Sequence, residues 1–147
     1  MAPSASRSGV SPQVSVFLEN RALRQSLSLI LADFGYTVTA YRKADEWKHS
    51  LKEVPADLYV VGPGSKVRLQ HVVDLRRAVP QIPALFVAED LAFTDVVAAM
   101  HHRVVDVFEE PLDLEAVSHR LAVLFPEQTR IVPESEEGLM LIRAHAA

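Results

Sequence analysis

The chain has 147 residues, 49% of them hydrophobic, so it is long enough for one well-packed domain and too short for two ordinary ones. Its net charge of −4 gives no reason to expect direct binding to a nucleic acid. The absence of cysteine excludes disulfides, thiolate metal ligands and cysteine nucleophiles. No stretch approaches the ~18 consecutive apolar residues of a membrane span, and the N-terminus lacks the apolar core of a signal peptide. These features predict a cytoplasmic protein without a membrane partner.

The first part of the chain predicts a lead-in followed by two strand–helix units. Residues 1–13 are rich in Ser and Pro, which is typical of a disordered segment. Strands are predicted at Val14 to Leu18 and at Thr37 to Tyr41. A helix from about Asn20 to Phe34 is predicted from apolar residues at helical spacing, with an N-cap at its start and Gly35 after its end. A second, shorter helix has one apolar face: Trp47, Leu51 and Val54.

The stretch from Asp57 to Gly64 predicts the central strand of a sheet. Its four apolar residues, LYVV, have no polar alternation and end at a Gly-Pro-Gly turn. Such a strand needs cover on both faces, as in the middle of a parallel sheet flanked by helices. Chemistry in open α/β sheets lies just beyond the carboxyl ends of the strands, and here that position is Gly62.

The same alternation continues to Phe125. Strands are predicted at Ile82 to Val87 and at Val104 to Phe108. Three further helices have apolar faces at helical spacing, and Asp113 is placed to cap the last: Val72, Leu75 and Val79; Phe93, Val96, Val97 and Met100; Leu114, Val117, Leu121 and Leu124. Five strands alternating with five helices predict an α/β, flavodoxin-like (βα)₅ three-layer sandwich with a five-stranded parallel sheet over residues 14–125.

Residues 126–147 break this pattern and are predicted to form a C-terminal extension. Pro126 and Pro133 interrupt the segment, and an apolar run follows at residues 139–142. A soluble protein rarely leaves such a run exposed without use. The run is expected to dock on its own domain, with partner binding as the alternative.

Three stretches of the alternating region resemble a known family. They are residues 24–27 (RQSL) with the helix exit at residues 34–36, residues 55–58 (PADL), and residues 106–113 (DVFEEPLD). In this order and spacing they resemble the receiver domain of bacterial two-component response regulators. The resemblance implies phosphoryl transfer from a histidine kinase to an aspartate ending the third strand. It also implies two acids that hold Mg²⁺, a Ser or Thr ending the fourth strand, and a Lys before the fifth-strand Pro.

The residues at these five positions depart from the family pattern: Leu18, Glu19, Gly62, Ala88 and Glu110. Gly62 stands at the acceptor position and offers no carboxylate for an aspartyl-phosphate. Glu110 stands at the lysine position, so an anion replaces the cation that would attract a phosphoryl group. The resemblance therefore implies a degenerate, or pseudo-, receiver without catalytic residues, and we expect no metal and no cofactor. It also predicts a cis Glu110–Pro111 peptide bond.

The carboxylates at the carboxyl edge of the predicted sheet leave two interpretations. Glu19, Glu110, and Glu89 or Asp90 are expected to converge there, and clustered carboxylates suit Ca²⁺ or Mg²⁺. The favoured interpretation is a salt bridge from Glu110 to Lys66 or Arg68, with the other carboxylates solvated.

Two functions follow from the sequence. The leading hypothesis is a phosphorylation-independent protein-interaction module in bacterial signalling. Its partner would be a histidine kinase, a response regulator or a second copy, with a homodimer left open. The family's usual docking face would here carry His101, His102, Arg103, Asp113, Glu115, His119 and Arg120. The alternative is a small-molecule or metal-sensing domain that uses the altered pocket around Gly62.

Overall fold

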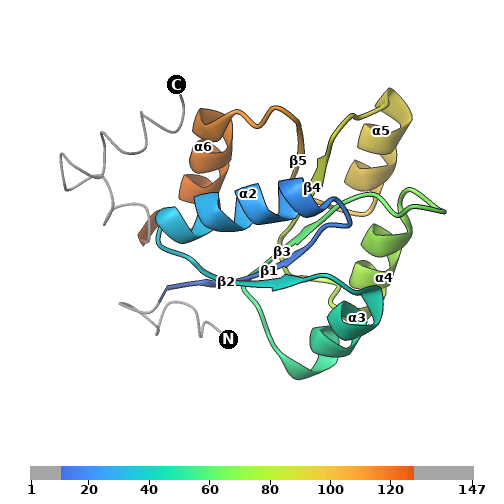
Figure 1. The fold of residues 1–147 in the computed structure, drawn as a ribbon, viewed down its shortest axis with the longest axis horizontal. Helices are drawn as coiled ribbons and strands as arrows, with labels where there is room; N and C mark the ends of the chain where they lie inside the picture. Colours follow the sequence, from blue (N-terminus) through green and yellow to red (C-terminus); the bar gives the residue numbers. More distant parts are fainter. Residues whose placement is uncertain (1–10, 128–147) are drawn as a thin grey trace.

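A computed structural model describes residues 11–127, which form one parallel sheet flanked by helices (Figure 1). The strands lie in the order β2-β1-β3-β4-β5. They are β1 (Gln13–Phe17), β2 (Thr37–Tyr41), β3 (Leu58–Val61), β4 (Ala84–Ala88) and β5 (Asp106–Glu109). The helices are α2 (Arg21–Asp33), α3 (Ala44–Glu53), α4 (Gln70–Ala78), α5 (Phe93–His101) and α6 (Leu114–Leu124). This is the predicted flavodoxin-like alternation of five strands and five helices, and the fold class is confirmed.

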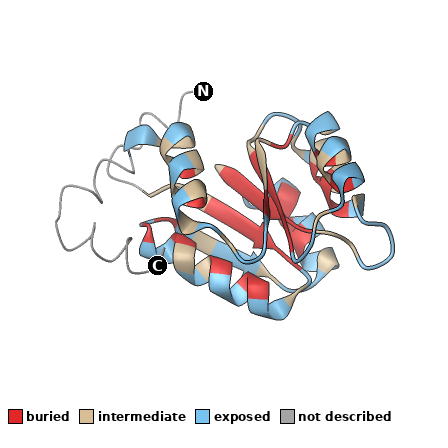
Figure 2. Cartoon of the chain, turned by 90° about the horizontal axis from the view of Figure 1, so that it is seen from above, coloured by how far each residue is buried: buried red, intermediate tan, exposed pale blue. Residues whose placement is uncertain are grey.

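The helices divide into two layers, each with its own hydrophobic cluster. Helices α2 and α6 pack on one face of the sheet, and α3, α4 and α5 pack on the other. Figure 2 shows the buried residues concentrated in the strands and on the sheet-facing sides of the helices. Because all five strands are parallel, their carboxyl ends lie at one edge of the sheet.

Strand β3 is the central strand, as its apolar run predicts. All four of its residues are buried. Leu58 and Val60 join the cluster under α2 and α6, whereas Tyr59 and Val61 join the cluster under α3, α4 and α5. A strand that alternates between two cores has no solvent-facing side, which explains why its sequence lacks polar alternation.

The predicted capping residues form the helix ends. The side chain of Asn20 accepts a hydrogen bond from the Leu23 N–H at the start of α2. Asp113 accepts from the Glu115 and Ala116 N–H groups at the start of α6. Gly35 follows α2 with a φ of 99°, a left-handed conformation that glycine adopts readily. These local contacts fix where α2 and α6 begin and where α2 ends.

Two predicted helix faces are wrong in part. Val54 lies beyond the end of α3 and is 50% exposed, because the chain has already become extended there before Pro55. In α5 three of the four residues of the predicted apolar face are turned outward: Phe93, Val97 and Met100 are 81%, 52% and 47% exposed, whereas Val96 is partly buried.

The sheet instead receives the opposite side of α5, where Asp95 and Ala99 are buried one turn apart. Ala99 is small enough to let the helix approach the sheet, and Asp95 is held by an ion pair with Arg68. The result is an exposed apolar strip along α5, defined by Phe93, Val97 and Met100.

Hydrogen bonds hold the start of the described chain against the sheet. The N–H of Gln13, the first residue of β1, donates to Asp57 Oδ2 at 2.8 Å, and Pro12 O accepts from Thr37 N–H at 3.0 Å. Residues 1–10 and residues 128–147, including the apolar run at 139–142, lie outside the described residues. Within residues 11–127, no helix has both the length and the apolar character needed to cross a membrane.

Candidate functional site

Three of the family-equivalent positions lie together at the carboxyl ends of adjacent strands. Leu18 follows β1, Gly62 follows β3 and Ala88 ends β4, and all three are buried. A Cβ atom built on Gly62 would lie 2.8 Å from Leu18 Cδ2 and 2.8 Å from the Val87 carbonyl oxygen. Both distances are far shorter than a normal van der Waals contact. The Leu18 side chain and the β4 backbone therefore leave room for glycine alone at this position.

Glu19 is directed away from this apolar centre toward α4. Its Oε2 atom lies 2.7 Å from His71 Nε2, and the His71 side chain is only 9% exposed. The His71 ring also packs against Phe17 and Trp47, with ring centroids 4.7 and 5.8 Å away. Trp47 is fully buried and stacks on Phe17 at 4.7 Å, so its predicted packing role is confirmed. The contact between Glu19 and His71 ties the β1–α2 turn to α4.

The predicted salt bridge from Glu110 to Lys66 or Arg68 is not among the ion pairs of residues 11–127. Arg68 Nη2 lies 2.7 Å from Asp95 Oδ2, and the same atom donates to the Asp90 carbonyl oxygen at 3.0 Å. Arg68 lies in the β3–α4 loop, so these contacts join that loop to the β4–α5 loop. The hydrogen bond from Arg68 holds the pKa of the Asp95 carboxyl below its usual value. Arg68 is thus engaged where α5 begins.

The carboxylates at this edge have separate surroundings. Glu110 is exposed, and its N–H donates to the Ala88 carbonyl oxygen at 3.0 Å. Glu109 Oε2 accepts from the Leu91 N–H at 3.0 Å. Among residues 11–127, no group of three or more His, Asp or Glu side chains is arranged to hold a metal ion. The Glu110–Pro111 bond is cis, as predicted.

The residues of the expected docking face lie around α5, β5 and α6. His101 ends α5, and its ring lies 5.7 Å from that of His102. Two of the other members are engaged within the fold. Asp113 caps α6, and Arg120 Nε lies 3.1 Å from Asp106 Oδ2 on β5. Arg103 follows the helix end with a φ of 63°, and Glu115 and His119 are exposed on α6.

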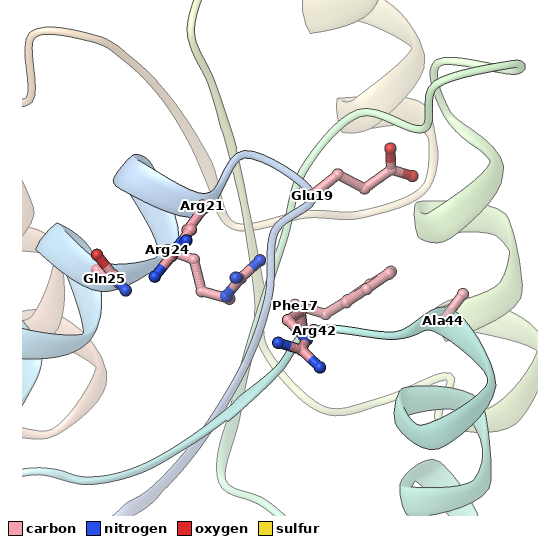
Figure 3. Close-up of a pocket in the computed structure, with 7 residues that line it drawn as sticks. All are labelled: Phe17, Glu19, Arg21, Arg24, Gln25, Arg42 and Ala44. Atoms are coloured by element: carbon pink, nitrogen blue, oxygen red, sulfur yellow. The ribbon is translucent and has the colours of Figure 1, made fainter.

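One hollow at the carboxyl edge was not predicted from the sequence. A cavity of about 670 Å³ lies beyond the ends of β1 and β2, and Figure 3 shows the residues that line it. Three arginines line it: Arg21 and Arg24 from the first turn of α2, and Arg42 immediately after β2. A signal was available, because both segments follow strands and the carboxyl ends of parallel strands meet at one edge.

Comparisons with known proteins find similarity to solved structures alone. No family model matches the sequence, and no curated protein matches it. Solved receiver structures do match the fold. A response regulator receiver protein from Pseudoalteromonas atlantica superposes with a TM-score of 0.69 at 16% identity, over 78% of this chain and 98% of that chain. One from Pseudomonas putida has a TM-score of 0.69 at 22% identity, over 77% and 97%.

A third similar structure is the beryllofluoride-activated NtrC4 receiver domain dimer. Its TM-score is 0.68 at 18% identity, over 79% of this chain and 98% of that chain. These identities are low, so the likeness concerns the fold. The chain has the fold of response regulator receiver domains.

Proposed function

We propose that this chain is a phosphorylation-independent, receiver-like protein-interaction module in two-component-type signalling. The packing around Gly62 carries this proposal. The position that the resemblance equates with the phospho-acceptor has no side chain, and Leu18 and the Val87 carbonyl occupy the space that one would need. Without a carboxylate there, the attack on a phosphoryl group has no nucleophile. The function then depends on the surface of the fold.

The exposed strip on α5 supports a protein-interaction role. Phe93, Val97 and Met100 lie on one side of the helix, and a shallow hollow of about 440 Å³ runs from Phe93 and Val97 toward His101 and His102. Large aromatic and Met side chains on an exposed face are typical of protein contact surfaces. The strip adjoins the docking face predicted from the family resemblance. Its proposed partner is a signalling protein, and the first candidate is a second copy of this chain, since a similar receiver is a dimer.

The alternative function, a sensor of small molecules or metals around Gly62, has less support at that place. Leu18 and Ala88 are each 1% exposed, so the centre of the edge is apolar and filled. Glu19 is engaged with His71. A cation or a polar ligand would have to displace a closely packed side chain to reach Gly62.

Intact mass spectrometry of the full chain tests phosphorylation independence. After incubation with acetyl phosphate and Mg²⁺, we expect no gain of a phosphoryl group, because no acceptor carboxylate lies at the end of β3. A receiver domain with an intact acceptor serves as the positive control. A phosphoryl group mapped to residues 11–127 would contradict the proposal.

Light scattering over a range of protein concentrations tests the surface. We expect self-association that weakens in Phe93→Ser, because that side chain is 81% exposed at the start of the strip. Leu29→Ser is the matched control, since Leu29 is 68% exposed on α2, on the other side of the sheet. Equal effects of the two substitutions would remove α5 as the interaction face. A monomer at every concentration would exclude the second copy as partner.

A further inference from the structure

The cavity beyond β1 and β2 has an unusual charge for this protein. The whole chain has a net charge of −4, yet three arginines line this one hollow. Within residues 11–127, no carboxylate forms an ion pair with Arg21, Arg24 or Arg42. Glu19 also lines the hollow, but its carboxylate is paired with His71, and Figure 3 shows its side chain directed away from the arginines. The cavity therefore concentrates positive charge that the described protein does not neutralise.

Arg24 is the most informative member of this group. Arg24 is only 8% exposed, and a buried guanidinium requires hydrogen-bond acceptors. Its Nη1 donates to the Leu18 carbonyl oxygen at 2.7 Å, which is the one acceptor found for it in residues 11–127. A guanidinium has five N–H donors. The remaining donors are available to a ligand in the cavity that Arg24 lines.

The helix itself adds to the positive potential. Arg21 and Arg24 lie in the first turn of α2, which contains no acidic residue. The N-terminus of a helix carries a partial positive charge, so arginines there oppose the dipole while an anion is favoured. Local choices that oppose stability are expected at functional sites. Asn20 satisfies the Leu23 N–H, which leaves the earlier N–H groups of the turn for other acceptors.

We propose that Arg21, Arg24 and Arg42 form a binding site for a phosphorylated small molecule. Guanidinium groups bind phosphate oxygens through paired N–H donors, and Glu19, the carboxylate among the lining residues, is engaged with His71. The volume of about 670 Å³ is in the range of small-molecule sites and exceeds what one phosphate ion fills. Arg42 follows β2, whereas Arg21 and Arg24 lie in α2, so the ligand bridges two separate segments of the chain. This site lies apart from the α5 strip and goes beyond the proposed function.

Isothermal titration of the full chain with ADP, pyrophosphate and inorganic phosphate tests the site. We expect ADP and pyrophosphate to bind more tightly than inorganic phosphate, because each carries more than one phosphoryl group for three arginines. Adenosine, which lacks phosphate, should not bind. Tighter binding of ADP than of pyrophosphate would identify a nucleotide source, and equal binding would identify the diphosphate group itself; either outcome supports the site.

Matched substitutions locate the binding. Arg42→Ala should weaken it at least about tenfold, the effect of losing one charge-assisted contact of ~1.4 kcal/mol. Arg42 is exposed and has no hydrogen bond or ion pair within residues 11–127, so this variant should fold normally. Arg77→Ala removes the same charge from the exposed side of α4 and should leave affinity unchanged.

Three outcomes would overturn the inference. The first is that ADP, pyrophosphate and inorganic phosphate all fail to bind at about 1 mM, the weakest affinity that defines a site. The second is an equal loss of affinity in Arg42→Ala and Arg77→Ala. The third is binding of a poly-glutamate peptide that ADP and pyrophosphate do not displace. Each leaves the interaction role of α5 untouched. That role fails instead if Phe93→Ser has no effect on association while phosphate binding persists.

Discussion

Replacing Gly62 with alanine tests the packing that closes the centre of the carboxyl edge. The added Cβ would lie 2.8 Å from Leu18 Cδ2 and 2.8 Å from the Val87 carbonyl oxygen. Leu18 is only 1% exposed and has little room to move, and the carbonyl belongs to the β4 backbone. Overpacking of this kind typically lowers the free energy of unfolding by roughly 1–3 kcal/mol. We expect a loss in that range for Gly62→Ala.

Urea denaturation followed by circular dichroism measures this loss, and a double-mutant cycle assigns it. Leu18→Ala alone should cost about 2–5 kcal/mol, because it opens a cavity in the core. In the double variant the clash with Leu18 Cδ2 is gone, so the combined loss should fall short of the sum by at least ~0.5 kcal/mol. The contact with the Val87 carbonyl remains and keeps Gly62→Ala destabilising in both backgrounds.

Two results would refute this reasoning. Gly62→Ala could leave the unfolding free energy within ~0.5 kcal/mol of the parent, which is the range of an ordinary surface substitution. Alternatively, strict additivity in the cycle would show that Leu18 does not fill the space beside Gly62. The same geometry predicts that Gly62→Asp destabilises the fold instead of restoring a phospho-acceptor.

One ion pair and one hydrogen-bond network give further predictions. Arg68 lowers the pKa of Asp95, so the stability that Asp95 adds is full above its unfolded pKa and is lost as the pH falls through the folded one. The difference in unfolding free energy between the parent and Asp95→Asn should therefore shrink below about pH 4, and a constant difference would contradict this. Arg76 donates to the carbonyl oxygens of residues 79, 82, 102 and 103. Thermal unfolding of Arg76→Ala should reveal a loss of about 2–4 kcal/mol from those unsatisfied acceptors, with Arg77→Ala, on the exposed side of α4, nearly neutral.

Much of the fold could be read from local sequence because local interactions set it. Apolar spacing located all five helices and strands to within a few residues, and Asn20 and Asp113 form the predicted caps. The unbroken apolar run of β3 indicated a strand covered on both faces, and its central place is confirmed. Periodicity and capping depend on neighbours in the chain, so they can be read without knowing the tertiary structure.

The face of α5 that packs on the sheet could not be predicted in this way. Its sequence offers two sides, one with Phe93 and Val97 and the other with Asp95 and Ala99. Apolar spacing favours burial of the first side. The structure buries the second, because Arg68 from a distant loop neutralises Asp95 and Ala99 permits close packing. A choice between two helix faces depends on what the sheet and neighbouring loops present to the helix.

The candidate sites were likewise determined in part by the sequence and in part by the tertiary structure. The sequence alone determined that Gly62 has no carboxylate and that Glu110 is not a cation. Only the tertiary structure decided that Leu18 fills the space beside Gly62, that Glu19 pairs with His71, and that Arg42 joins Arg21 and Arg24 around one cavity. Glu19 and His71 are 52 positions apart in the chain, and Arg21 and Arg42 approach only because β1 and β2 are parallel neighbours. A sequence states which chemical groups are present, whereas the strand order determines which of them meet.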